Sequence, residues 1–325
     1  MAWGDAGDNV RLTRPNDPMH TSGSHARTPP YRGRFAPSPT GPLHLGSLTA
    51  ALASRLEAHR HNGTWLLRIE DIDRGREVPG AASGILHALD LHGFTWDGPV
   101  VYQKNRETAY EEAVDQLLAS KLAYPCGCTR RNRVIGSLGS AIYPGTCRQG
   151  LPAGRRTRAI RARTHDRPIS FSDSLQGNQE QSLESTTGDF VIRRADGWYA
   201  YQLAVVVDDA WQGITEIVRG MDLLDSTPRQ LYLQHCLQLP TPHYAHLPLV
   251  VDQNGNKLSK STGSAALDPR CPGENLWLAL RLLRQNPPTS LCRAPSHALW
   301  DWARAHWSPT ALQGVRTSRL SDLSA

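Results

Sequence analysis

RFAPSPTGPLHLGS, residues 34–47, decides the fold, because it joins a short strand to a helix through a loop dense in proline and glycine. Residues 31–36 have the composition of a strand, and residues 46–60 carry leucines at helical spacing before the capping sequence HNG. TWLLRIE, residues 64–70, predicts a second strand. Strand, helix and strand in this order form a βαβ unit, so we expect an α/β fold with a parallel sheet.

The loop in this stretch has the composition of a phosphate-binding turn. A helix N-terminus carries unpaired N–H groups and a partial positive charge, and Gly41 and Gly46 allow a ligand close to the backbone. His44, at the helix entrance, can donate a hydrogen bond to a phosphate. Ligands of parallel sheets bind beyond the carboxyl ends of the strands, which places this loop beside residues 70–73, EDID. Alone, such a loop is more often a plain turn.

A second motif, KLSKS at residues 257–261, supplies positive charge. It follows an expected strand at 247–252 and a connection rich in Gly and Asn. Two ammonium groups over a crevice would neutralise charge that develops on a triphosphate during in-line displacement. Alone, KLSKS is typical of a solvated loop. Paired with the earlier loop, it predicts an ATP site made of Gly41, His44, Gly46, Lys257, Ser259 and Lys260, with His44, Lys257 and Lys260 assisting the chemistry.

The remaining sequence predicts a core interrupted by an insertion. We expect a disordered leader at 1–30, two core halves at 31–125 and 189–262, an insertion at 126–188 and a short helical C-terminal region at 263–325. Further helices are expected at 81–92, 108–121, 228–239, 274–284 and 296–305. Further strands are expected at 189–194, 198–207 and 213–218, the second because its VVV run suits a buried strand.

Composition indicates an ordinary soluble protein, with 39% hydrophobic and 20% charged residues. No apolar run approaches the roughly 18 to 20 residues that cross a bilayer, and residues 1–30 contain no signal-peptide block. We therefore expect a cytoplasmic protein without a membrane partner. No surplus apolar surface is evident, so we expect a monomer.

Arginine is concentrated in the insertion. Residues 126–168 contain ten arginines against one acid, Asp166, a local charge of +9. A solvated loop face would account for such a run, but guanidinium groups also match phosphate geometry. A polyanion partner, nucleic acid above all, is the second interpretation.

Three cysteines of the insertion, Cys126, Cys128 and Cys147, lie within 22 residues. A Cys-x-Cys pair is tighter than the usual zinc knuckle, so spacing leaves a zinc site and free thiols equally open. A zinc site would need a fourth ligand, for which His165 is one candidate. Cysteines 236, 271 and 292 are isolated and are interpreted as structural or surface thiols.

The two loop motifs resemble those of a known family. PSPTGPLHLGS is similar to the "HIGH" signature, and KLSKS to the "KMSKS" signature, of class I aminoacyl-tRNA synthetases of the glutamyl branch. The resemblance continues through RIEDID, GDFVIRRADGWYAYQLAVVVDDAWQGITEIVRG and DLLDSTPRQ, and covers roughly residues 34–261. It implies a Rossmann-like class I synthetase catalytic core. Ser47 stands where the general signature has its second histidine, so no role of that histidine carries over.

The resemblance also implies a glutamate site. Its residues would be Arg34, Ala36, Ser38, Glu70, Tyr201 and Arg219. Side-chain chemistry agrees, because two arginines can each fork a carboxylate while Glu70 takes the ammonium group. A buried arginine facing the side-chain carboxylate would reject neutral glutamine. The alternative for each arginine is a salt bridge within the fold.

Only 64 residues follow KLSKS, too few for the helical domain with which a glutamyl-tRNA synthetase reads an anticodon. This shortness and the CxC...YxxxC pattern resemble the glutamyl-Q tRNA(Asp) synthetases. That family implies ATP-dependent activation of L-glutamate without tRNA, then transfer to queuosine in the tRNA(Asp) anticodon. It also implies one structural Zn²⁺ held by Cys126, Cys128, Tyr143 and Cys147. Mg²⁺ would accompany ATP, and Asp71 and Asp73 could equally serve the fold.

Three alternatives stay open. The chain could be a truncated glutamyl-tRNA synthetase that charges tRNA(Glu), against which the short C-terminal region argues. It could be a catalytically inactive RNA-binding paralogue, although it keeps His44 and both lysines of KLSKS. It could also be a small-molecule nucleotidyltransferase or ligase of similar fold, against which the arginine-rich insertion argues.

Overall fold

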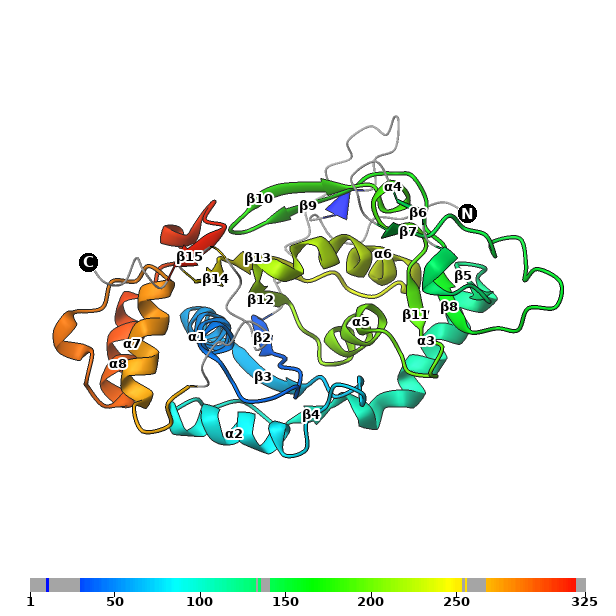
Figure 1. The fold of residues 1–325 in the computed structure, drawn as a ribbon. Coiled ribbons are helices and arrows are strands. Elements are labelled where there is room, and N and C mark those ends of the chain that lie inside the picture. Colours follow the sequence, from blue (N-terminus) through cyan, green and yellow to red (C-terminus); the bar gives the residue numbers. More distant parts are fainter. Residues whose placement is uncertain are drawn as a thin grey trace.

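The computed structural model describes residues 10–11, 30–132, 134–135, 141–252, 255 and 267–319. The predicted βαβ unit is confirmed: it consists of β2 (Arg32–Phe35), α1 (Leu45–Arg60) and β3 (Thr64–Ile69). β2 pairs in parallel with β3, which pairs in parallel with β4 (Val101–Tyr102). The molecule is α/β, with a parallel sheet at its centre (Figure 1).

A second parallel pair continues the sheet on the other side of β2. β12 (Glu216–Gly220) pairs with β13 (His243–Leu247). The backbone N–H of Thr215, just before β12, donates to the carbonyl of Arg32 at 3.0 Å, so β2 and β12 lie side by side. The sheet therefore extends from β2 to both sides, toward β3 and β4 on one side and toward β12 and β13 on the other. The carboxyl ends of β2 and β12 meet at the topological switch point between the two sides.

The strand predicted at 198–207 is wrong, because these residues enter a helix. α5 (Tyr201–Trp211) buries Leu203, Ala204, Val205 and Val206, and also Asp208 and Asp209. A helix enclosed on most sides shows no apolar stripe, and its valines favour a strand by local propensity. Packing against α3 (Glu107–Ala119) and α6 (Thr227–Leu237) overrides that preference.

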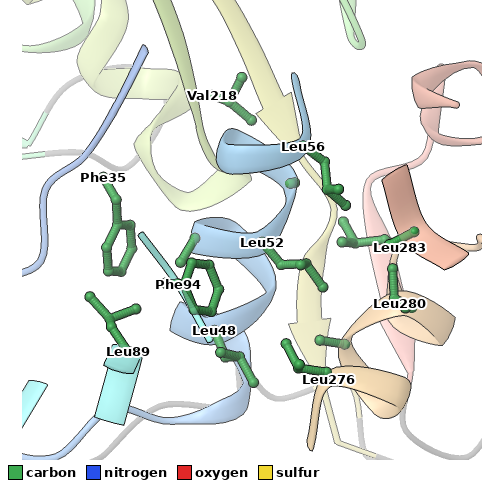
Figure 2. Close-up of a cluster of buried hydrophobic side chains, with 14 of the residues drawn as sticks. Phe35, Leu48, Leu52, Leu56, Leu89, Phe94, Val218, Leu276, Leu280 and Leu283 are labelled. Carbon is green, nitrogen blue, oxygen red and sulfur yellow. The ribbon is translucent and has the colours of Figure 1, made fainter. Parts of the chain in front are cut away.

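The other predicted helices are confirmed within a few residues. Besides α3 and α6 they are α2 (Ala81–Leu91), α7 (Pro272–Leu282) and α8 (Ser296–His306). Leu48, Leu52 and Leu56 on α1 face Leu276 and Leu280 on α7 in one buried cluster (Figure 2). The C-terminal helices thus cover the side of α1 that turns away from the sheet. Short 3-10 helices lie at Gln103–Arg106, Arg130–Asn132, Met221–Ser226, Thr289–Leu291 and Pro309–Leu312.

The segment assigned to the insertion is built mostly of short strands. β8 (Ala159–Ala162) pairs antiparallel with β5 (Ala123–Cys126) and β11 (Val191–Arg193), so it closes the end of the molecule opposite α7 and α8 (Figure 1). The remaining elements are β6 (Val134–Ile135), β7 (Ala141–Ile142), β9 (Ile169–Asp173), β10 (Gly177–Gln181) and α4 (Leu183–Thr186).

β9 joins the insertion to the core sheet. It pairs in parallel with β13 and antiparallel with β10. β1 (Val10–Arg11) also pairs with β9, so two residues of the predicted leader are ordered as a strand. The rest of that leader lies outside the described residues.

The predicted strand 247–252 is divided at Pro248 into the end of β13 and β14 (Leu249–Val251). Proline has no N–H for a strand ladder, which explains the break. β14 pairs in parallel with β15 (Thr317–Arg319), close to the C-terminus. None of the helices formed by the described residues has the length and apolar character of a membrane span.

Candidate active site and cysteine cluster

A cleft of about 710 Å³ lies beyond the carboxyl ends of β2 and β12. It brings together eight of the residues predicted from the sequence. They are Arg34, Ala36, Ser38, His44, Gly46, Glu70, Tyr201 and Arg219. Segments nearly 200 residues apart in the chain thus form one wall, as the switch point of a parallel sheet predicts.

The N-terminus of α1 opens onto this cleft. His44 is the N-cap residue, and its Nδ1 accepts from the backbone N–H of Ser47 at 3.3 Å. Its Nε2 lies 3.0 Å from the Ser47 hydroxyl. Because Nδ1 is an acceptor, the neutral ring carries its proton on Nε2, which faces that hydroxyl and the cleft. Ser47, to which the sequence analysis assigns no role, therefore contacts the ring that we predict to contact ATP.

Gly41 belongs to the loop between β2 and α1 but is not among the cleft-lining residues. Its φ of 137° lies in the region that L side chains avoid, so the turn itself requires glycine. An ATP contact of Gly41 stays a prediction.

The residues of KLSKS fall outside the described part of the chain, so the ATP contacts of Lys257, Ser259 and Lys260 stay predictions. The chain reaches this motif from β14, and Leu249 and Val250 of that strand line the cleft.

A buried ionic network connects Arg34 and Glu70 in the wall of the cleft. Arg34 donates to both carboxylate oxygens of Asp209, from Nε at 3.1 Å and from Nη2 at 3.4 Å. Arg68 donates to Asp209 at 2.8 Å and to Glu70 at 3.3 Å. Asp209 and Arg68 were not identified from the sequence, because their partners lie up to 175 residues away. The sequence marks them only as charged residues within or beside apolar runs, Arg68 in TWLLRIE and Asp209 after the VVV run.

The pKa values in this network follow from burial and pairing. Burial alone would raise the pKa of Asp209, but Arg34 and Arg68 hold it below its ordinary value. Burial raises the pKa of Glu70, and the attraction of Arg68 and Arg34 only partly opposes it. Burial also raises the pKa of Tyr201, so its phenol stays a hydrogen-bond donor near neutral pH.

Arg219, at the end of β12, has a different environment. Its Nε donates to Nε2 of His246 at 3.0 Å, and its Nη2 donates to the Thr227 hydroxyl at 2.8 Å and to the carbonyl of Leu223 at 3.3 Å. Its Nη1 is buried with no hydrogen-bond partner among the described residues. Arg219 forms no ion pair with any described carboxylate, although it is only 5% exposed. Its charge therefore lacks an anionic partner in the described part of the chain, and an anion in the cleft would supply one.

Two acidic residues after β3, Asp71 and Asp73, form ion pairs within the fold. Asp71 accepts from the backbone N–H of Lys104 at 2.9 Å and pairs with its ammonium group at 3.3 Å. Asp73 pairs with Arg76 at 2.7 Å and with Arg194 at 3.0 Å. These two carboxylates are already neutralised, so they do not form a cage for a divalent cation.

The three cysteines of the insertion meet in a separate buried cluster with Tyr143. The sulfur atoms of Cys126, Cys128 and Cys147 all lie within 4.8 Å of one another. Sγ of Cys128 is 3.6 Å from that of Cys147, and the Tyr143 hydroxyl lies 3.4 Å from Cys126 Sγ and 3.6 Å from Cys128 Sγ. Ligands of tetrahedral zinc are separated by about 3.5 to 3.8 Å, so this cysteine cluster fits such an ion. His165 does not join it but packs edge-on against Tyr232.

Arg161 borders the cysteine cluster. Its Nε donates to Cys126 Sγ at 3.2 Å, and its guanidinium lies 3.8 Å from the centre of the Tyr143 ring. Burial alone would raise the pKa of Cys126, but hydrogen bonds from Tyr143, Cys128 and Arg161 lower it below its ordinary value. Burial and the neighbouring sulfurs raise the pKa of Tyr143. The phenol would therefore need a bound cation before it could ionise.

Eight of the ten arginines of the run have side chains that the structure describes, and these eight divide into two groups. Arg148, Arg161 and Arg163 are structural: Arg148 pairs with Asp189 at 2.6 Å and with Glu184 at 2.8 Å, and Arg163 donates to main-chain carbonyls. A second group is exposed and forms no ion pair with a described residue. It consists of Arg131, Arg155, Arg156, Arg158 and Arg167. Among the described arginines of the run, this second group is the one that can offer charge to a polyanion.

Comparison with known proteins agrees with the cleft. A family model described as "tRNA synthetases class I (E and Q), catalytic domain" matches residues 31–270. A glutamate-tRNA synthetase structure from Elizabethkingia anophelis superposes with a TM-score of 0.74 at 26% identity, over 89% of this chain and 68% of that one. A glutamate tRNA ligase from Elizabethkingia meningosepticum, in complex with its amino acid, gives the same TM-score and identity over 89% and 67%.

Curated relatives are more similar in sequence. A glutamyl-Q tRNA(Asp) synthetase from Aromatoleum aromaticum is 55% identical over 86% of this chain and 90% of that protein. One from Dechloromonas aromatica is 54% identical over 86% and 94%. The chain belongs to the class I tRNA synthetases of the E and Q group and, within them, to the family of the glutamyl-Q tRNA(Asp) synthetases.

Proposed function

We propose that this enzyme activates L-glutamate with ATP in the absence of tRNA and then transfers the glutamyl group to the queuosine base in the anticodon of tRNA(Asp). The observation that carries the first half is Arg219, a buried guanidinium without a carboxylate partner in a cleft that also contains Glu70. Glutamate has two carboxylates and one ammonium group, which complement this arrangement. The names of the curated relatives carry the second half.

In the first step the glutamate α-carboxylate attacks the α-phosphorus of ATP, which forms glutamyl-adenylate and releases pyrophosphate. Arg34 and Arg219 bind the carboxylates, and Glu70 accepts hydrogen bonds from the ammonium group. The N-terminus of α1 and His44 contact the nucleotide, while Lys257 and Lys260 stabilise charge on the phosphates. Mg²⁺ arrives with ATP, because Asp71 and Asp73 are already paired.

In the second step a hydroxyl of the queuosine cyclopentene-diol attacks the mixed anhydride, and AMP leaves. The exposed arginines 131, 155, 156, 158 and 167 would bind tRNA phosphates, because they have no carboxylate partner among the described residues. The cysteine cluster would hold a structural Zn²⁺ through Cys126, Cys128, Tyr143 and Cys147. Its own chemistry is structural, since the four ligands leave no open position.

Transfer of radiolabelled glutamate to tRNA(Asp) with and without queuosine tests this proposal. We expect labelling only of the queuosine-containing tRNA, with ATP–pyrophosphate exchange that needs glutamate but no tRNA. Equal labelling of both tRNAs would contradict the transfer step. Charging of tRNA(Glu) would favour a truncated glutamyl-tRNA synthetase, and absence of exchange would favour an inactive RNA-binding paralogue.

The metal is tested separately. We expect about one zinc per chain in purified wild type and none in Cys126→Ser. Cys236→Ser is the matched control, because Cys236 is buried on α6 away from the cysteine cluster. Zinc retained in full by Cys126→Ser would contradict the site.

A further inference from the structure

Arg219 is held from behind by two buried side chains that have no role in the proposed reaction. His246 on β13 accepts from Nε of Arg219 at 3.0 Å. Nδ1 of the same ring lies 2.5 Å from Oδ2 of Asp173 on β9. His246 is 0% and Asp173 2% exposed, so neither exchanges its partner for water. The chain Asp173, His246, Arg219 runs from the interior to the wall of the cleft.

The hydrogen-bond chemistry of this chain fixes the imidazole proton. A guanidinium group only donates, so Nε2 of His246 must be the acceptor and the proton of the neutral ring sits on Nδ1. Nδ1 then donates to Asp173, whose other oxygen accepts from the backbone N–H groups of Leu175 at 3.0 Å, Gln176 at 2.9 Å and His246 at 3.1 Å. These bonds keep Asp173 ionised, and the ionised carboxylate holds the tautomer.

Because the acceptor for Arg219 is a neutral histidine and not a carboxylate, the hydrogen bond orients the guanidinium without neutralising its charge. Asp209 neutralises Arg34, whereas His246 orients Arg219 and leaves its charge uncompensated. Nε and Nη2 of Arg219 are occupied by His246, Thr227 and Leu223, which leaves Nη1 buried without a partner among the described residues. The guanidinium is thus fixed in its plane by protein groups, and the two N–H groups of Nη1 and the positive charge are left for a ligand.

We propose that His246 and Asp173 are positioning residues for amino-acid binding: Asp173 holds the tautomer of His246, and His246 holds the Arg219 guanidinium so that it receives a carboxylate of glutamate. This inference rests on the proposed glutamate-activating function. It explains why a histidine and an aspartate that touch no substrate are buried behind the cleft.

Two substitutions at His246 separate positioning from packing. Glutamine places an amide oxygen near the position of Nε2 and keeps an acceptor for Arg219. Asparagine places its amide near Nδ1, keeps the bond to Asp173 and removes the acceptor. In ATP–pyrophosphate exchange we expect His246→Asn to raise the KM for glutamate tenfold or more and His246→Gln at most threefold. The KM for ATP should change less than twofold in both variants.

His92 provides the matched control. Its Nδ1 lies 2.6 Å from the carbonyl of Ala88, its Nε2 accepts from the Asn275 amide at 3.0 Å, and the residue is 1% exposed. It therefore has the same tautomer and burial but lies away from the cleft. His92→Asn and His92→Gln should lower thermal stability without a change in either KM.

Asp173→Asn tests the outer member of the chain. An amide N–H facing Nδ1 would favour the tautomer with its proton on Nε2, and that proton would oppose the Nε–H of Arg219. We expect a rise in the KM for glutamate of fivefold or more, again without a change for ATP. Since KM does not depend on the folded fraction, a loss of yield does not obscure the result.

The inference is overturned if His246→Asn and His246→Gln raise the glutamate KM equally, if the ATP KM rises in parallel, or if the His92 variants behave in the same way. Failure of the proposed function looks different, because wild type itself would then show no glutamate-dependent exchange.

Discussion

The cleft and the cysteine cluster are both lined by buried polar groups, but the kind of group that lacks a partner differs between them. In the cleft it is a positively charged group, and in the cysteine cluster it is a set of groups that can become negatively charged. Around the cleft, three buried arginines, Arg34, Arg68 and Arg219, have two buried carboxylates as direct partners among the described residues, Asp209 and Glu70, while Asp173 reaches Arg219 only through His246. In the cysteine cluster, three thiols and a phenol have one buried arginine beside them. Buried groups need partners, so a surplus of one sign indicates the ligand. We therefore infer that the cleft takes an anion and that the cysteine cluster takes a cation.

The strongest test of this comparison removes the negative charge of Asp209, which pairs with Arg34 and Arg68 beside the cleft. Asp209→Asn leaves Arg34 and Arg68 buried without their shared carboxylate, and we expect the free energy of unfolding to fall by about 3–5 kcal/mol at pH 7. Denaturant titration measures it. Asp301→Asn, in an exposed pair with Arg304, should change it by less than about 0.5 kcal/mol.

This loss should depend on pH. The folded-state pKa of Asp209 lies below its ordinary value, so its stabilisation is present above the unfolded pKa of about 3.9 and is lost as pH falls through the folded value. A constant difference between wild type and Asp209→Asn down to pH 2 would show that packing, not charge, is responsible.

The next test removes the positive charge of Arg219, the arginine without a direct carboxylate partner among the described residues. Arg219→Gln keeps donors at the end of β12 but no charge, and we expect kcat/KM for glutamate to fall about 100-fold, or about 3 kcal/mol. ATP–pyrophosphate exchange measures it, with Arg304→Gln on α8 as the control. Unchanged kinetics in Arg219→Gln would mean that this arginine serves only the fold.

On the cation side, Tyr143→Phe tests whether the phenol oxygen is a ligand. The ring and its contact with Arg161 remain, so we expect zinc affinity to fall about 10- to 100-fold without collapse of the insertion. Competition with a chromophoric chelator measures it. Tyr124→Phe is the control, because the Tyr124 hydroxyl donates to Asp189 and not to a sulfur. Equal affinities in wild type and Tyr143→Phe would leave only the three thiolates.

The smallest effect is expected at the amino end of β12, opposite the cleft. Burial, with Glu57 nearby, raises the pKa of Glu216 to about 7. Its ionisation therefore costs stability as pH rises from the unfolded value of about 4.3 through 7. We expect Glu216→Gln to be more stable than wild type by about 1 kcal/mol at pH 8 and equal at pH 4, by thermal unfolding. A pH-independent difference would contradict a titrating Glu216.

The sequence predicts those parts of the molecule that depend on local pattern. The first βαβ unit and the helices at both ends follow from periodicity. The meeting of Arg34 with Arg219 in one cleft is implied only by the family resemblance. The helix α5 does not, because burial on most sides removes its period.

The pairing of charges is equally hidden from the sequence. Arg34 and Arg219 are alike as letters, yet Asp209 neutralises one and His246 only orients the other. Those partners lie 175 and 27 residues away, and no local rule chooses between them. The same holds for the arginine-rich run, where Arg148 and Arg161 support the fold while their neighbours are exposed.

The cover that α7 and α8 place over α1 has a consequence for synthesis in the cell. Trp300 packs edge-on against Phe94, and the Trp307 indole donates to Glu57 at 2.5 Å, so the last helices complete the core around the first. Roughly 210 residues separate the end of α1 from the start of α7, which takes about 10 to 40 s to translate. During that time the leucines of α1 lack the cover of α7 and α8, and the nascent chain is exposed to aggregation and available to chaperones.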